Sequence, residues 1–346
     1  MSPELLLTGG TGFVGYYLAH ALAAAGRPFA ALVRPGADAR QFKELEPYCT
    51  LIEGDLLDPL SLYDALEGIT TVVHAAALVS FEDQREEDML AVNGTGTANL
   101  VNMMIQAGAR RLVHLSTVAV LNRIDGGRAV TVADRWPLKR PNTAYARSKF
   151  AAEREIWRGQ AEGLSVAALY PSTILGAGDW QGANTPGLWK RVDEGLRIHP
   201  RGSAGFVDVR DVARAALAVL DRNVDRDRFL LNAGHLTWKA FFALVAASVG
   251  SSAPAFGLSR WQSALLWPLA GLGARMTGRP PAITRASHRV AQADYHYDGG
   301  PYPEATGQAY HPLEATIRET GQAYRISKSA GSGLPPTYLP VLDVAH

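Results

Sequence analysis

Residues 4–25 run ELLLTGGTGFVGYYLAHALAAA, and this stretch decides the fold. Its first part, Glu4 to Thr8, is a short apolar run that predicts a buried strand, and Tyr16 to Ala25 has the pattern of a helix. Between them, glycines three residues apart allow a tight turn and a close approach to a pyrophosphate, which the free N–H groups of a helix N-terminus would bind. The predicted residues of this dinucleotide-binding loop are Gly9, Thr11, Gly12, Phe13, Val14 and Gly15.

Outward from this loop, short apolar runs alternate with helical patterns as far as about residue 170. This alternation is typical of an α/β fold with a doubly wound parallel sheet, the Rossmann fold. The chain has 346 residues, so we also expect a smaller, mostly C-terminal substrate lobe. We expect further strands at 28–34, 50–53, 71–75, 111–116, 165–170, 206–209 and 229–232, and helices at 212–220, 238–249 and 313–325.

The domain organisation follows from the same patterns. We assign residues 1–170 and 205–234 to the dinucleotide-binding domain, and residues 171–204 and 235–328 to the substrate lobe. Residues 329–346 are rich in Ser, Gly and Pro, and we expect them to form a flexible tail.

Composition narrows the class of protein. The net charge of +1 at pH 7 gives no electrostatic basis for binding nucleic acid. The single cysteine, Cys49, suits a reducing compartment, and no leader-like segment precedes the first strand, so we expect a cytoplasmic protein. We expect no metal site. The apolar stretch 264–274, flanked by Trp261 and Trp267, is too short to cross a bilayer, which leaves a buried helix or contact with a membrane surface.

Arg34 bears on the choice of cofactor. It ends the second predicted strand, where NAD-preferring folds place an acid that binds the ribose 2′-hydroxyl. An arginine there can instead bind a 2′-phosphate through its planar guanidinium, with Arg40 assisting, so we expect NADP. If Arg34 is only a solvated surface residue, NAD is the alternative. Further cofactor-binding candidates follow the third, fourth and fifth strands at Asp55, Leu56, Ala75, Ala76, Ala77 and Ser116. His74, beside the alanines, is interpreted as a packed core residue.

Tyr145 and Lys149 form the candidate catalytic pair. Their spacing of four residues places both side chains on one face of a helix that extends to about Glu162. A phenol has a pKa of about 10 and needs a nearby positive charge to act at neutral pH, which Lys149 supplies. Tyr324 and Lys328 repeat the spacing beside the tail, and we attribute that copy to chance.

Three polar residues join this pair. Ser116 and Thr117 end the fifth predicted strand, so they enter the same cleft and can donate a hydrogen bond to a substrate oxygen. Asn93 either positions a water that links Lys149 to solvent or serves as a cap or turn residue. Asp208 and Asp211 are interpreted as a structural loop and a helix cap rather than as metal ligands.

Together these motifs resemble the extended short-chain dehydrogenase/reductases over about residues 4–325. The resemblance rests on the glycine loop, on His74 to Ala76, Asn93, Ser116, Thr117, Tyr145 and Lys149, and on the run FVDVRDVA at 206–213. Arg34 makes the chain look most like the dihydroflavonol-reductase and hydroxysteroid-dehydrogenase branch. The resemblance implies that Tyr145 is the acid/base, that Lys149 lowers its pKa and holds the ribose, and that Thr117 takes the place of the usual serine. Pro171 and Ile174 would lie near the nicotinamide.

The function implied is hydride transfer between NADPH and a fairly apolar carbonyl substrate, with Tyr145 protonating the oxygen. The expected substrate residues are Ser80, Phe81, Thr117, Tyr145, Thr173 and Trp180. A wider apolar set either lines the pocket or packs the smaller lobe; it consists of Val79, Phe81, Trp180, Leu188 and Trp189.

Two other functions stay open. A nucleotide-sugar epimerase would need a diphosphate-binding arginine, such as Arg191, Arg197 or Arg201. A non-catalytic NADP sensor would not need the Tyr–Lys pair. We expect a homodimer through 86–107 and 143–162, with a small molecule as substrate.

Overall fold

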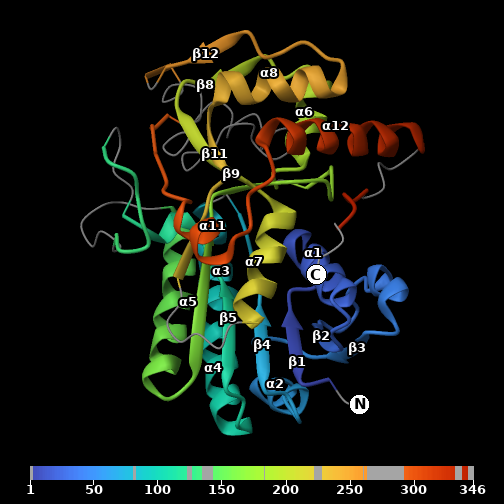
Figure 1. Cartoon of the computed structure of the whole chain (residues 1–346), viewed down its shortest axis with the longest axis vertical. Helices are drawn as coiled ribbons and strands as arrows, with labels where there is room; N and C mark the ends of the chain where they lie inside the picture. The colour runs from blue at the N-terminus through green and yellow to red at the C-terminus, as the bar shows by residue number, and fades with distance from the viewer. Residues whose placement is uncertain are drawn as a thin grey trace.

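A computed structural model describes residues 3–80, 83–122, 127–134, 143–182, 184–221, 228–259, 261–262, 292–331 and 337–341. Its centre is a seven-stranded sheet in the order β10-β6-β5-β4-β1-β2-β3, with every neighbouring pair parallel (Figure 1). In chain order the strands are β1 (Leu5–Thr8), β2 (Phe29–Val33), β3 (Cys49–Glu53), β4 (Thr71–His74), β5 (Arg111–Leu115), β6 (Ser165–Pro171) and β10 (Arg228–Leu231). The strand order reverses between β1 and β4, which is where doubly wound sheets bind ligands. The predicted Rossmann fold is confirmed.

Helices cover both faces of this sheet. All four residues of β1 are buried, as expected for a parallel strand with a helix layer on each side. Leu5 and Leu7 belong to one apolar core and Leu6 to the other, because successive side chains of a strand point to opposite faces. The first core includes α1 (Phe13–Ala24) and α7 (Val209–Asp221); the second includes α2 (Pro59–Ala65), α4 (Gly96–Ala107) and α5 (Ala144–Ala161).

The predicted strands of the main sheet agree with the structure to within one residue at each end. The stretch expected as a strand at 206–209 is β9 (Ser203–Asp208), which lies in a second sheet of order β11-β9-β7 with β7 (Thr173–Leu175) and β11 (Gly234–Thr237). The boundary predicted at residue 205 therefore divides β9. Among the described elements of 205–234, α7 packs on α1 and β10 pairs with β6 of the main sheet.

The remaining elements build the smaller lobe, seen in the upper part of Figure 1. They are α6 (Gly187–Asp193), the paired strands β8 (Ile198–Pro200) and β12 (Phe256–Leu258), α8 (Trp238–Val249) and α12 (Leu313–Ser329). Shorter helical segments connect these elements along the chain. They include η1 (Arg40–Leu45), α3 (Glu86–Met89), the π-helical η3 (Leu90–Thr95), η4 (Val118–Val120) and α11 (Pro301–Thr306). The predicted helix at 238–249 is α8 itself, with Thr237 accepting a hydrogen bond from Ala240 N as its cap.

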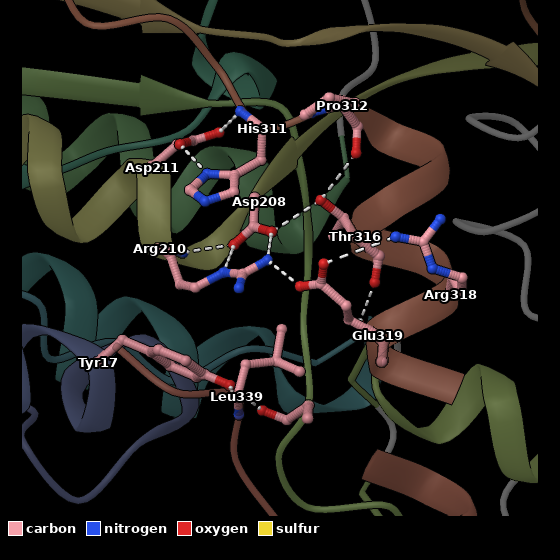
Figure 2. A network of polar contacts seen from close by, with 12 residues as sticks. Tyr17, Asp208, Arg210, Asp211, His311, Pro312, Thr316, Arg318, Glu319 and Leu339 are labelled. Atoms are coloured by element: carbon pink, nitrogen blue, oxygen red, sulfur yellow. Dashed lines mark hydrogen bonds and ion pairs between the residues drawn. The ribbon is translucent and has the colours of Figure 1, made fainter. Parts of the chain in front are cut away.

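A buried polar network ties α12 to the start of α7 (Figure 2). Arg210 Nη2 lies 2.6 Å from Asp208 Oδ2 and 2.8 Å from Glu319 Oε2, and Thr316 Oγ1 donates to Asp208 Oδ2 at 2.7 Å. Asp211 accepts a hydrogen bond from His311 N at 2.9 Å. Both aspartates are thus engaged by the protein itself, in the structural role predicted for them.

Part of the predicted flexible tail is docked. The ring of Tyr338 stacks on that of Tyr16 with 3.5 Å between centroids, and Leu339 N donates to Tyr17 Oη at 2.9 Å. Tyr17 Oη in turn donates to Ala177 O at 2.8 Å. For residues 337–341 the prediction of a free tail is therefore wrong, because an aromatic and an apolar side chain hold this segment on α1. Residues 332–336 and 342–346 lie outside the described part.

Among the described helices, none combines the length and the apolar character that crossing a bilayer requires. The apolar stretch 264–274 and Trp267 lie outside the described residues. Trp261 is described, and 66% of its surface is exposed.

Candidate active site

The glycine loop joins β1 to α1 in a conformation that only small residues allow. Gly9 has a φ of +75°, and a Cβ added there would lie 2.5 Å from Ala76 N. A Cβ on Gly15 would overlap the carbonyl oxygen of Gly9. Gly12 is the N-cap of α1 and donates to Gly9 O at 3.0 Å, with no side chain capping the helix. The first turn of α1 thus presents its backbone N–H groups and the positive end of its dipole at the carboxyl end of β1, which suits a pyrophosphate.

Gly15→Ala is expected to lower the free energy of unfolding by about 1–3 kcal/mol, because the new methyl group forces α1 away from the loop. Urea unfolding measures this effect, and fluorescence titration with NADPH should show weaker binding of the dinucleotide. Gly12→Ala is the matched control: its Cβ would lie 3.3 Å from Gly9 O and its backbone is extended, so a smaller loss is expected. Equal stability of the Gly15 variant and wild type would contradict the tight packing described above.

Arg34 follows β2 and is exposed, and its side chain has no partner among the described residues. Arg40, expected to assist it, is instead paired with Asp38, with 2.6 Å between Arg40 Nη2 and Asp38 Oδ2. The adjoining segment η1 is fastened to the glycine loop, because Gln41 Nε2 donates to Gly10 O at 2.6 Å. Arg34 therefore follows β2 at the same edge of the sheet where the glycine loop follows β1.

The cofactor-binding candidates that follow β3 and β4 differ in what their side chains contact. Asp55 Oδ1 accepts a hydrogen bond from Leu57 N at 2.9 Å. This bond stabilises the loop after β3 and leaves the other carboxylate oxygen available. Leu56 is buried against Gly96 of α4, so its side chain packs in the core. The residues Ala75, Ala76 and Ala77 are half-buried next to the glycine loop.

His74 is the packed core histidine that was predicted. Thr97 Oγ1 donates its hydrogen to Asn93 O at 2.6 Å, so His74 Nε2, 3.0 Å from the same hydroxyl, must donate. Its Nδ1 then accepts from Thr8 Oγ1 at 2.7 Å. Burial, together with the nearby Lys149 ammonium, lowers the pKa of His74 to about 3, so the ring is neutral.

The catalytic candidates meet at the carboxyl end of β5. Thr143 caps α5 by accepting from Ala146 N at 3.2 Å, which places Tyr145 in the first helical turn. The hydroxyl of Thr117 lies beside the Tyr145 phenol and favours its ionised form. Lys149, one turn further on, is buried, and its Nζ donates to Leu115 O at 2.8 Å. Ser116 is also buried, but its hydroxyl has no partner among the described residues, so Thr117 is the residue that faces Tyr145.

The proton affinities of the pair are set mainly by burial. Burial raises the pKa of Tyr145 to about 12, and the Thr117 hydroxyl opposes that rise. Burial lowers the pKa of Lys149 to about 8, and the charge of Glu153 opposes that fall. The Lys149 ammonium donates to Leu115 O and is not among the groups that shift the Tyr145 pKa here, so the lowering of that pKa by Lys149 stays a prediction.

Asn93 has a bracing role. Its Oδ1 accepts from Leu78 N at 2.7 Å, and its Nδ2 donates to Leu78 O and Ser148 Oγ, each at 2.9 Å. These bonds join η3 to the segment after β4 and to α5. Asn93 thus lies within η3 with both side-chain groups engaged, and its positioning of a water that links Lys149 to solvent stays a prediction.

The predicted substrate residues are dispersed. Trp180 is fully buried, and its Nε1 donates to Ser327 Oγ of α12 at 2.9 Å, so its assignment as a substrate residue is wrong. Trp189 is likewise buried and donates to Ser248 Oγ at 3.2 Å, so both tryptophans pack the lobe. Closer to β6, Pro171 is buried, whereas Ser80, Thr173, Ile174 and Leu188 are half-buried and Val79 is exposed. Phe81 lies outside the described residues.

The sequence model of the "NAD dependent epimerase/dehydratase family" matches residues 5–234. The chain belongs to this family. It is 31% identical to sterol demethylase protein B of Methylococcus capsulatus over 239 residues, which are 67% of this chain and 70% of that protein. It is 26% identical to a putative dihydroflavonol 4-reductase of Synechocystis over 332 residues, 92% of this chain and 94% of that protein. The crystal structure of gox2253 superposes with a TM-score of 0.81 at 25% identity, covering 94% of this chain and 98% of that one. The predicted membership of the extended short-chain dehydrogenase/reductases is confirmed.

In this member of the epimerase/dehydratase family, the second Tyr–Lys pair is structural. Tyr324 Oη and Lys328 Nζ lie 2.8 Å and 2.6 Å from Asp193 Oδ2, so they tie α12 to α6 in the smaller lobe. The pair therefore lies away from the strand ends and repeats the spacing of Tyr145 and Lys149 without sharing their site.

Two residues near the Tyr–Lys pair were missed. His114 of β5 has its Nε2 3.3 Å from Lys149 Nζ, and Glu153 is buried one turn beyond Lys149 on α5. The spacing of four residues between Lys149 and Glu153 was a usable signal, since it places both on one helix face. For His114, no local pattern distinguishes it from any other strand residue.

Proposed function

We propose that this protein is an NADP-dependent oxidoreductase that reduces a fairly apolar ketone or aldehyde, or oxidises the corresponding alcohol. The observation that carries the proposal is the meeting of Thr117, Tyr145 and the buried Lys149 at the carboxyl end of β5, with Lys149 one helical turn beyond Tyr145 and its Nζ bonded to Leu115 O. Relatives named for a sterol and for a dihydroflavonol support a ring-containing, apolar substrate.

The described residues fit a dinucleotide. The glycine loop leaves room that a Cβ would fill, and the first turn of α1 is uncapped by any side chain. The exposed Arg34 follows β2, the strand paired in parallel with β1, at the same edge of the sheet. In this position Arg34 would bind a 2′-phosphate, and the glycine loop would hold the pyrophosphate. Bound NADP would supply the hydride to a carbonyl carbon or accept it from an alcohol.

Tyr145 acts as the proton donor in reduction. With a pKa of about 12 it is protonated at neutral pH, and it can donate to the carbonyl oxygen as negative charge develops there. The hydroxyl of Thr117 orients the phenol and can donate to the same oxygen. The Lys149 ammonium favours the phenolate that is left behind. Alcohol oxidation needs the phenolate at the start, so the burial of Tyr145 favours reduction near neutral pH.

The deciding experiment measures loss of NADPH absorbance with a panel of ketones, aldehydes and nucleotide sugars. Net consumption of NADPH on an apolar ketone is the expected result. Interconversion of a nucleotide sugar without net consumption would instead identify an epimerase, and failure to bind either NADPH or NADH would remove the proposal and the sensor alternative together.

Cofactor choice is tested by Arg34→Ala, which is expected to weaken NADPH binding about 10-fold to 100-fold and to leave NADH binding unchanged, since it removes charge-assisted hydrogen bonds to the 2′-phosphate. Fluorescence titration with both cofactors measures the two affinities. Arg40→Ala is the control, because Arg40 is already engaged by Asp38. A loss of the same size for both cofactors would contradict a 2′-phosphate site.

The epimerase alternative is not favoured by the arginines that it needs. Arg201 Nε donates to Gly257 O at 3.1 Å, which holds this side chain on the β8–β12 pair. Arg197 is exposed, and Arg191 is half-buried on α6.

A cytoplasmic location and a homodimer through the outer surfaces of α4 and α5 form part of our proposal.

A further inference from the structure

Glu153 is a buried acid that the reaction outlined above does not use. It lies on α5, one turn beyond Lys149 and two turns beyond Tyr145, on the same helix face. Only 7% of its surface is exposed. The hydroxyls of Ser116, after β5, and of Tyr170, on β6, lie beside its carboxyl group. Glu153 therefore sits in the core directly behind the catalytic candidates.

The other neighbours of Lys149 are neutral. Its Nζ donates to Leu115 O and lies 3.3 Å from His114 Nε2. Burial keeps the pKa of both His74 and His114 below the ordinary range, so neither ring carries a charge at neutral pH. Burial also raises the pKa of Tyr170, which stays a neutral phenol. Of the described residues, Glu153 is the one whose negative charge acts on the Lys149 ammonium.

Burial raises the pKa of Glu153, and the neighbouring Tyr170 hydroxyl and two cations oppose that rise. Its Oε1 is buried without a hydrogen-bond partner among the described residues, and so are the hydroxyls of Ser116 and Tyr170. A buried carboxylate in such surroundings is costly unless a cation balances it. Two cations act on it, Lys149 from within α5 and the exposed Arg228 of β10, whose guanidinium lies over the ring of Trp157.

We propose that Glu153 is the buried counter-ion of Lys149, and that its negative charge keeps the Lys149 ammonium protonated behind Tyr145. Within the described structure the two groups form no direct ion pair, so Glu153 acts through its charge and is a positioning residue that does not touch the substrate. The charge state of Lys149 can be measured without any substrate, whereas its consequence for catalysis rests on the proposed function. Neutralising Glu153 should release the Lys149 proton at lower pH, because burial would then act unopposed.

The test measures the pKa of Lys149 directly. The chain contains six lysines, so protein carrying lysine labelled with ¹³C at Cε gives few signals, and the Lys149 signal is identified by its loss in Lys149→Met. Titration of the cofactor-free protein compares wild type, Glu153→Gln and the control Glu155→Gln. Glu155 is on the same helix but pairs with Arg158 at the surface. We expect Glu153→Gln to lower the proton affinity of Lys149 at least about tenfold and Glu155→Gln to leave it unchanged. An unchanged Lys149 titration in folded Glu153→Gln would overturn the proposal.

A second readout uses turnover. For carbonyl reduction, the alkaline fall of kcat should follow the loss of the Lys149 proton, so it should move to lower pH in Glu153→Gln and stay in place in Glu155→Gln. Inactivity of wild type on every carbonyl would defeat the proposed function and leave the lysine titration intact. If Glu153→Gln does not fold, ¹³C labelling of glutamate in wild type decides the matter: an ionised Glu153 at pH 7 supports the counter-ion, and a protonated one overturns it.

Discussion

Tyr145→Phe is expected to lower kcat for carbonyl reduction by a factor of about 10²–10⁴, because it removes the proton donor and nothing else. The ring of the variant still packs against α5 and β5, so NADPH should bind as it does to wild type. Stopped-flow or steady-state loss of NADPH absorbance measures kcat, and fluorescence titration measures cofactor binding on the same protein samples.

Tyr324→Phe is the matched control for this experiment. Tyr324 has the same spacing to a lysine, yet its hydroxyl donates to Asp193 in the smaller lobe, away from the strand ends. It should cost some stability, about 1 kcal/mol for one lost hydrogen bond, with kcat unchanged. Full activity of Tyr145→Phe would exclude the phenol as the acid, and the Thr117 hydroxyl would then be the remaining donor in the cleft.

Acid should destabilise the fold well before most carboxylates titrate, because His74 and His114 are buried as neutral rings. The pKa of His74 is about 3 in the folded chain, against an ordinary value of 6.5, and burial holds that of His114 well below the same value. Below pH 6.5 the unfolded chain binds protons that the folded chain cannot, so the free energy of unfolding falls as pH falls. Each ring contributes up to about 1.4 kcal/mol per pH unit once the pH is well below 6.5, hence about 3 kcal/mol for both between pH 6.5 and pH 5.

Urea unfolding followed by circular dichroism at several pH values between 7.5 and 4.5 measures this slope. His74→Gln keeps a donor and an acceptor but removes the titration, and it should reduce the slope by about one bound proton. A slope that His74→Gln does not change would show that His74 can be protonated within the folded protein.

The parts of the fold predictable from sequence are those that depend on local pattern. Each strand of the main sheet is a short apolar run bounded by turn residues, and the glycine loop has a spacing that only one local geometry requires. The same holds for Tyr145 and Lys149, since a helix fixes the relative positions of residues four apart. Their meeting with Thr117 follows from parallel strands that end at one edge of a sheet.

What escaped prediction depends on contacts between distant segments. Trp180 and Trp189 lie in a stretch rich in glycine and proline, and such a stretch can form a pocket wall or part of a core. Both tryptophans are buried because α12 and α8, from distant parts of the chain, cover them. Glutamate in a helix is usually exposed, so the sequence gives no sign that Glu153 is buried. Its burial arises from the neighbouring strands β5 and β6. The tail was judged by its Ser, Gly and Pro content, which says nothing of where Tyr338 would find an aromatic partner.

The docking of Leu339 on Tyr17 has a consequence for how the molecule is made. The two residues are 322 positions apart in the chain. At translation rates of about 5–20 residues per second, Tyr17 leaves the ribosome roughly 15–65 s before Leu339 is added. During that time the helix that carries the nucleotide loop has its outer face uncovered, even when the sheet beneath it has assembled. This contact of the first helix can form only after residue 339 has been added, and a chain stalled before that residue never makes it.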